Sequence, residues 1–551
     1  MPSKPSTNDN RFRTLVVHFF NRFFDTDTVS DEPVLRARLI QSLALLAVVS
    51  GMFFMYLAIR GGDESGIPFT AVFYAMVVMG LVMTFKWDSL FPDRRDYLIL
   101  TPLPVSGKRL FGAKAVALGL FLVPFLIAMN IVPTLLILAT RPSTLIGHLV
   151  AVLAASIFSV LFFAGLQGVL VNVLPSSTFR RISPPIQIIS IAFLIMLLLA
   201  VPLVVSVTPF LLVADSALLD YVPPVWFLGL FEVLKFSGSA SPQAARWALT
   251  AIEALGLTAV IVSLSYVVGY RRHSRTVLES IQSEDFTPAP WRTAAGNLLH
   301  SILVTNAAQR AVFEFLDTVS DRSSKHRISA ALYSGLGLAL VLIRLFVIDG
   351  REGFPIRFST SGLLEAPAVL SFVIVAGWRA TFGIPYELSA NWIFQIAGRG
   401  SAVDFRKAIR KWVFTRRVLP VYALLAVFEF FLFDAQTAAV HLAVDLATTA
   451  FLIEAFFFGF PKVPFTCDHL RKKLQLAAYA VGYLYAYTNY VFYAAALKIW
   501  VVSSRSHLIA FLITSAMLFV GILTFRVLAR AERARIIYDE PDPSFLRLNL
   551  S

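Results

Sequence analysis

Long apolar runs alternate with shorter polar segments along almost the whole chain. A helix needs roughly 20 mostly apolar residues to cross a bilayer. Runs near that length occupy residues 39–59, 67–85, 115–139, 146–173, 185–212, 247–270, 328–348, 363–380, 418–434, 438–460, 474–497 and 506–528. The pattern predicts an all-α polytopic membrane protein with about 12 transmembrane helices.

Two further segments have the period of a helix but are too polar to cross a membrane. In residues 11–24, apolar side chains recur every three or four positions with basic residues between them. The apolar set is Phe12, Leu15, Val16, Phe19, Phe20, Phe23 and Phe24. We expect this helix to lie in the inner membrane interface with its apolar face toward the acyl chains, although a helix docked on a partner protein would show the same pattern. A related cytoplasmic amphipathic segment, 295–317, precedes the seventh predicted span.

The composition excludes an ordinary soluble fold. Of the 551 residues, 57% are hydrophobic and 15% are charged, whereas soluble domains carry about 25% charged residues. The single cysteine, Cys467, excludes an internal disulfide and any metal site built from several cysteines. Residues before Leu39 lack the short apolar core of a signal peptide, so we expect the first span to be retained.

Basic residues indicate the orientation, because lysine and arginine stay on the cytoplasmic side of a membrane. With the N-terminus inside, most of the 48 Lys and Arg residues fall in cytoplasmic segments. The remainder are Arg60, Arg141, Lys235, Arg246, Arg344, Arg351, Arg357, Lys498 and Arg505. Both termini are therefore predicted to be cytoplasmic. Contact of the basic loops with anionic lipid explains the net charge of +14, so no nucleic-acid partner is expected.

The order of long and short segments repeats within the chain. In each half an amphipathic stretch leads to a span, a short outer loop, a second span and a long cytoplasmic loop, at 86–114 and 379–417. We predict two six-helix halves, 1–285 and 286–551. Both begin and end in the cytoplasm, so they would be parallel repeats related by an axis along the membrane normal. A chance likeness of basic, aromatic loops is the alternative.

The motifs of several enzyme classes are missing from the sequence. No phosphate-binding loop of the form GxxxxGK[ST], no HExxH and no GxSxG motif occurs. His469 follows Cys467 closely, but one cysteine and one histidine do not make a metal site. We therefore expect no catalytic residue, no metal site and no cofactor in this chain.

Polar residues inside the predicted spans are candidates for function, because they are costly in a membrane. The second half contributes Glu429, Asp445 and Glu454, and the first half contributes the uncharged Gln167 and Asn172. They could line a substrate path, and the carboxylates could couple transport to protons. A protonated acid, or an interhelical pair that holds the bundle together, is the alternative interpretation.

The first long cytoplasmic loop combines charges of both signs with aromatic residues and prolines. Its sequence Phe91-Pro92-Asp93-Arg94-Arg95-Asp96-Tyr97 is followed by an apolar stretch that ends at Val105. A proline-stiffened segment loses little entropy when it docks, so this loop favours contact with a protein partner. A loop resting on the lipid surface is the alternative.

Further motifs accompany this loop at intervals along most of the chain. They are Lys108-Arg109 with Lys114, residues 223–232 (PPVWFLGLFE), Arg310-Ala311-Val312-Phe313 with Lys325-His326-Arg327, residues 387–394 (ELSANWIF) and residues 462–467 (KVPFTC). In their order and placement these motifs resemble the permease subunits of ABC-2-type transporters, and most closely a large bacterial subgroup with twelve spans.

The resemblance implies specific roles for several segments. The N-terminal helix would be interfacial, and residues 213–246, with Pro224, Trp226 and Glu232, would form an outer re-entrant region. The ATPase would be contacted by cytoplasmic loops through Asp93, Arg94, Arg95, Asp96, Tyr97, Glu387, Asn391 and Trp392. Residues 498–505 are too few for a second re-entrant helix, so the outer face is expected to be asymmetric.

The resemblance also implies a function. The chain would be the membrane subunit of an exporter in the bacterial cytoplasmic membrane, with ATP and Mg held by a separate ATPase, in two copies because the chain supplies both halves. A lipophilic or amphiphilic substrate would suit its apolar spans, which do not identify the substrate. A proton-coupled secondary transporter that uses Glu429 or Asp445 is the alternative. An intramembrane enzyme acting on lipids and a non-transporting scaffold are further alternatives.

Overall fold

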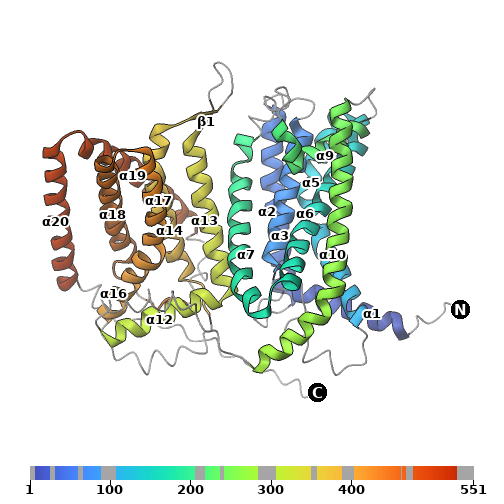
Figure 1. Cartoon of the computed structure of the whole chain (residues 1–551), viewed down its shortest axis with the longest axis horizontal. Helices are drawn as coiled ribbons and strands as arrows, with labels where there is room; N and C mark the ends of the chain where they lie inside the picture. The colour runs from blue at the N-terminus through green and yellow to red at the C-terminus, as the bar shows by residue number, and fades with distance from the viewer. Residues whose placement is uncertain are drawn as a thin grey trace. The chain divides into compact units, whose positions relative to one another are not determined.

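The computed structural model describes residues 7–24, 32–59, 66–87, 107–204, 217–235, 241–282, 306–348, 356–386, 402–460, 462–466 and 476–529. These residues are almost entirely helical (Figure 1). The chain divides into two compact units at residue 285. The two units are described separately below.

The first unit is built from long apolar helices. Its elements are α1 (Thr7–Phe24), α2 (Glu32–Ile59), α3 (Gly66–Phe85), α5 (Gly107–Thr140), a 3-10 turn η2 (Pro142–Thr144), α6 (Leu145–Val173), α7 (Ser176–Leu199), a 3-10 turn η3 (Ala217–Tyr221), α9 (Pro223–Leu234) and α10 (Pro242–Gln282). Helix α3 is the most enclosed, since α5, α6, α7 and α9 all pack on it. Almost all of its residues are buried, which is why it is apolar on every side.

Helix α1 confirms the helical period of residues 11–24, but its surroundings differ from those we expected. Val16, Phe19 and Phe23 are buried, and the helix packs along α5, where the rings of Phe23 and Phe121 lie 5.6 Å apart. Part of the apolar face therefore contacts the protein itself instead of acyl chains. The Lys114 ammonium lies 5.4 Å from the centre of the Phe19 ring and adds a cation–π contact.

The second unit begins with an amphipathic helix and continues with apolar ones. Its elements are α12 (Ala307–Arg322), α13 (Ser324–Leu345), β1 (Phe346–Ile348), β2 (Ile356–Phe358), α14 (Thr360–Thr381), α16 (Ala402–Trp412), a π-helical turn η5 (Val413–Val418), α17 (Leu419–Leu432), α18 (Ala435–Phe457), α19 (Leu476–Val502) and α20 (Arg505–Leu528). Its largest core gathers side chains from α12, α14, α16, α17 and α18.

A small hairpin closes one end of this unit. Strands β1 and β2 are antiparallel, with Phe346 opposite Phe358. The predicted span 328–348 is therefore wrong at its end, because residues 346–348 form β1 instead of a last helical turn. Gly362 lies directly against the carbonyl of Arg344, where a Cβ atom would overlap it, so α13 and α14 can pack closely only with glycine here.

Nine helices among the described residues are long and apolar enough to cross a membrane. They fall within α3, α5, α6, α7, α10, α13, α14, α18 and α20. The other three predicted spans correspond to α2, whose apolar part Leu43–Ile59 is shorter, to the 14-residue α17 and to the tyrosine-rich α19. The described residues are thus those of an all-α, multi-pass membrane protein, with one hairpin among them.

Candidate functional site

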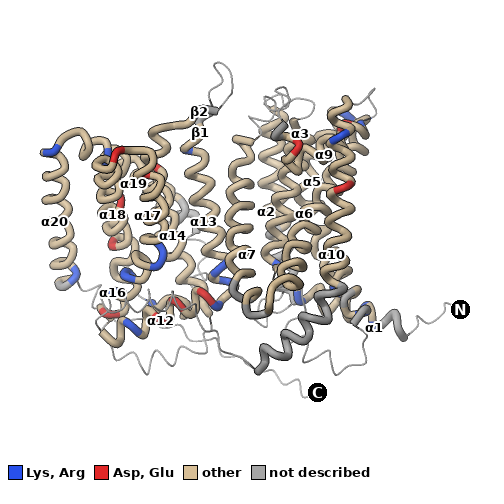
Figure 2. Tube along the Cα trace, viewed as in Figure 1, with Lys and Arg blue, Asp and Glu red and all other residues tan. Residues whose placement is uncertain are grey.

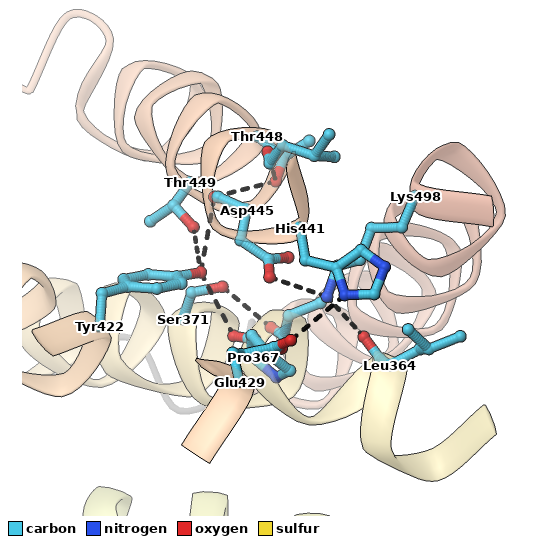
Figure 3. A network of polar contacts seen from close by, with 12 residues as sticks. Leu364, Pro367, Ser371, Tyr422, Glu429, His441, Asp445, Thr448, Thr449 and Lys498 are labelled. Carbon is cyan, nitrogen blue, oxygen red and sulfur yellow. Dashed lines mark hydrogen bonds and ion pairs between the residues drawn. The ribbon is translucent and has the colours of Figure 1, made fainter. Parts of the chain in front are cut away.

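A network of buried polar side chains connects α14, α17, α18 and α19 within the second unit (Figure 3). At its centre Lys498 of α19 and Asp445 of α18 form an ion pair of 2.8 Å, and neither side chain is exposed. Lys498 also donates to the carbonyl oxygen of Leu364 at 2.6 Å. The ammonium group thus binds both the carboxylate of one helix and the backbone of another, which ties three helices together.

Glu429 and His441 form the second contact of the network. The Nδ1 atom of His441 lies 3.2 Å from the Glu429 carboxylate, and both side chains are nearly enclosed. The ring of Phe433 stands edge-on to the imidazole at 5.0 Å between ring centres. This pair joins α17 to α18 beside the turn that connects them.

Hydroxyl groups extend the network away from the charges. The hydroxyl groups of Tyr422 and Thr449 lie 2.9 Å apart, and the Tyr490 hydroxyl lies 3.1 Å from that of Ser371. Tyr490 also lies 3.4 Å from Thr449, so four hydroxyl groups from α14, α17, α18 and α19 form one chain. Such a chain satisfies polar groups inside an apolar bundle and fixes the register of the helices.

The candidate residues predicted from sequence lie in different parts of the structure. Glu429 and Asp445 share this network, each with a base on a neighbouring helix. Glu454 lies toward the other end of α18, where Arg410 approaches it at 3.6 Å and Arg526 also contacts it. It therefore belongs to a separate, basic cluster between α16, α18 and α20.

Gln167 and Asn172 lie in the first unit and act between helices. Gln167 donates to the carbonyl oxygen of Trp87 at 2.6 Å, and Trp87 in turn donates to the Ser183 hydroxyl at 2.9 Å. Asn172 donates to the carbonyl oxygens of Gly168 and Ser265. These contacts tie α6 to the end of α3, to α7 and to α10, so both amides stabilise helix packing.

The described part of the predicted re-entrant region contains a turn and a short helix. Pro224 is buried at the start of α9, and Trp226 donates to the carbonyl oxygen of Asp220 at 2.7 Å. Trp247 of α10 donates to the Asp220 carboxylate at 2.7 Å, which fastens the turn to α10. Glu232 forms an ion pair with Lys235 one turn later.

A second assembly lies where α12 meets α16, and we call the described residues of α12, α16 and η5 the platform. Lysine, arginine and acidic residues gather around these two helices (Figure 2). Trp412 donates to the Asp317 carboxylate at 2.8 Å, and Arg416 pairs with the same carboxylate at 2.9 Å. Gln309 donates to Asp404 at 2.8 Å. The contacts fix α12 along α16.

Arg417, a partly buried cation of the platform, stacks on two tryptophan rings. Its guanidinium lies 4.1 Å from the ring centre of Trp378 and 4.5 Å from that of Trp412. It also donates to the Ser320 hydroxyl at 2.7 Å. One side chain thus connects α12, α14 and α16, and its planar group suits such stacking better than an ammonium would.

Lys411 donates to Gln309 at 3.0 Å on the same platform. Partial burial, followed by the nearby Lys407, lowers the pKa of Lys411, while Asp404 opposes that shift. The positive charges of α16 therefore already repel one another at its surface.

The residues predicted to contact an ATPase lie outside the described residues. They are Asp93, Arg94, Arg95, Asp96 and Tyr97 in one loop and Glu387, Asn391 and Trp392 in the other. The segments that flank the second loop are described. Tyr386 donates its backbone N–H to Phe465 at 2.7 Å, and Phe465 donates to Phe382 at 3.0 Å.

Sequence reasoning missed two residues of the buried network. The sequence places Lys498 in an outer segment, because it follows the predicted span 474–497. In the structure α19 continues to Val502, and the Lys498 side chain is fully buried against neighbouring helices. His441 was passed over because a single histidine in an apolar run has no motif. A signal existed in both cases, since a base and an acid within adjacent apolar helices are expected to pair.

Comparison with known proteins identifies no family, because no family profile, no curated protein and no solved structure matches this chain. Among the described residues no group of three or more His, Cys, Asp and Glu side chains could hold a metal ion.

Proposed function

We propose that this chain is the transmembrane permease subunit of an ATP-driven exporter. ATP and Mg are bound by two copies of a separate ATPase subunit, and this chain provides the path for a lipophilic or amphiphilic substrate. The protein lies in the bacterial cytoplasmic membrane with both termini in the cytoplasm. The motifs around residues 91–105 and 387–394 support this assignment.

The observation that carries the proposal is the anchoring of the chain on both sides of the second predicted ATPase-contacting loop. Tyr386, just before the loop, is hydrogen-bonded to Phe465, and Phe465 is bonded in turn to the end of α14. After the loop, α16 is fixed to α12 through Asp404 and Asp317. A loop with two anchored ends passes an applied force to the helices instead of absorbing it.

The path of that force follows from the continuity of the helices. Helix α16 runs through the π-helical turn Val413–Val418 into α17 without interruption. Helix α12 leads directly into α13, which packs closely against α14. Closure of an ATPase dimer on the loop would therefore move α17 and α13 together. The π-helical turn is a suitable hinge, because such turns are frequently found at functional sites.

The experiment that tests this proposal is affinity purification of the tagged chain from its native membrane in mild detergent, with partners identified by mass spectrometry. We expect a soluble ATPase with a phosphate-binding loop in stoichiometric amount. Scrambling residues 93–97 should remove it, while scrambling residues 531–535, which also carry charges of both signs, should not. A chain that purifies without an ATPase, under conditions that preserve known transporter complexes, would refute the assignment.

A further inference from the structure

Four ionisable side chains lie together inside the second unit and are almost completely enclosed by it. Lys498 and Asp445 are completely enclosed, and the side chains of His441 and Glu429 are only 5% and 6% exposed. All four side chains appear together in one view of the network (Figure 3). A group of charges in such a place is stable only if the charges balance.

The charges of these residues do not balance unless one proton is added. Two carboxylates and one ammonium leave a net charge of −1 when His441 is neutral. One proton restores neutrality, either on the imidazole or on the Glu429 carboxyl group. The contact of 2.8 Å between Lys498 and Asp445, supported by the Leu364 carbonyl, favours the charged forms of those two residues. The proton therefore belongs to the contact between Glu429 and His441.

We propose that Glu429 and His441 form a buried proton-binding site, which holds one proton while α17, α18 and α19 are packed together. The 3.2 Å separation between the imidazole Nδ1 and the carboxylate is a hydrogen-bond distance, so the proton can be shared between the two groups. The proposal does not depend on an ATPase partner.

Groups on the surrounding helices do not supply the missing charge. Helix α17 contributes Tyr422, α19 contributes Tyr490 beside Lys498, and α14 contributes Glu365. Glu365 is paired with Arg344 of α13 at 3.1 Å, so these two charges offset each other. Arg410 of α16 is engaged with Glu454 toward the far end of α18. Among the acid–base contacts of this network, the one between Glu429 and His441 contains an imidazole, which can be neutral or charged near neutral pH.

Loss of the proton would act on the packing of α17 against α18. The hydrogen bond would then persist only with the Nδ1–H tautomer of a neutral His441. The extra negative charge would lie in the same enclosed network as Asp445. Helix α17 is continuous with η5 and α16 of the platform. Binding or loss of the proton would therefore also affect the platform. A change of pH would shift the equilibrium between two packings of these helices.

The first test is the pH dependence of thermal unfolding of the full-length protein in lipid nanodiscs. The folded chain holds a proton that the unfolded chain releases at neutral and alkaline pH, so the unfolding midpoint should fall as pH rises. Glu429→Gln removes one negative charge and the need for the proton, so its midpoint should be much less sensitive to alkaline pH. Glu253→Gln, an exposed position of α10, is the matched control and should follow the wild type.

The second measurement uses the wild-type protein and does not depend on the folding of a variant. We expect two spectra to locate one proton at neutral pH. Nitrogen NMR of the labelled histidines reports the protonation of the imidazole, and His441→Gln assigns its signal. The infrared band of protonated carboxyl groups reports the protonation of Glu429. An imidazolium at His441 or a protonated carboxyl at Glu429 supports the site. A neutral imidazole beside an ionised carboxylate, or equal pH profiles of the wild type and Glu429→Gln, overturns it.

Discussion

Lys498 and Asp445 form an ion pair that is wholly enclosed between α19 and α18. Removing two charges from water costs several kcal/mol for each ion, roughly, and a close ion pair with extra hydrogen bonds offsets this cost. Here the extra hydrogen bond comes from the Leu364 carbonyl of α14. The pair therefore orders three helices, but it becomes costly when either partner is lost.

The first prediction concerns that pair. Lys498→Met leaves Asp445 ionised or protonated without its partner and should reduce the free energy of unfolding by about 3–5 kcal/mol. Asp445→Asn leaves the ammonium unpaired and should cost a similar amount. The double variant Lys498→Met with Asp445→Leu should be more stable than either single variant. Unfolding by SDS titration in mixed micelles measures all three, and additive losses in the double variant would contradict the pairing.

The second prediction concerns Arg417, which lies between the rings of Trp378 and Trp412. Arg417→Lys keeps the charge but loses the planar stacking, so it should destabilise the platform by about 1 kcal/mol. Limited proteolysis should then cut α12 faster than in the wild type. Arg310→Lys, an exposed position of α12, is the control and should leave the cleavage rate unchanged. Equal rates for both variants would show that the stacking does not hold α12.

The helices of this protein could be predicted because their signal is local. An apolar run such as 67–85 must be enclosed by lipid or by other helices, and α3 begins and ends within one residue of it. The amphipathic segment 295–317 likewise predicted a helix where α12 lies, with Val312 and Leu316 buried and Phe315 partly buried. The sequence did not predict the hairpin after α13, because its three-residue strands are too short to show an alternating pattern.

The candidate site could be predicted only in part, because its contacts join distant segments. Glu429 and Asp445 were found as charges within apolar runs, but their partners depend on how three helices are rotated against one another. Lys498 illustrates the difficulty, since a base at the end of an apolar run is usually a loop residue that reaches the interface. Its pairing with Asp445 became visible only when α18 and α19 were placed side by side.

The third prediction concerns the close approach of α9 and α10 at Gly229. A Cβ atom at this position would lie 2.5 Å from the Cβ atom of Trp247 and 2.7 Å from the Ala244 carbonyl oxygen. Gly229→Ala should therefore force the two helices apart and cost about 1–3 kcal/mol. Gly256→Ala on α10 is the matched control, since nothing lies within 4 Å of its Cβ position. It should instead stabilise the helix by about 0.5 kcal/mol. Thermal unfolding of both variants in one detergent compares them, and equal midpoints would contradict the close packing.

The fourth prediction concerns Asp434, whose carboxylate accepts the backbone N–H of Thr437 at 3.0 Å and caps the start of α18. This hydrogen bond lowers the pKa of Asp434 from its ordinary value of 3.8. Because the pKa is lowered in the folded state, the charged cap stabilises α18 fully at pH values above the ordinary pKa of 3.8. This stabilisation is lost as the pH falls through the lowered pKa. Asp434→Asn keeps an acceptor but does not titrate.

Hydrogen exchange of the Thr437 amide, measured for the wild type and Asp434→Asn at the same pH, isolates this effect because the intrinsic exchange rate cancels. At neutral pH the wild type should be better protected, since the negative charge also interacts favourably with the N-terminus of the helix. The ratio of protection should approach one as the pH falls below about 4. A ratio that stays constant over this range would mean that the charge of Asp434 contributes nothing to the start of α18, and that the cap acts through its hydrogen bond alone.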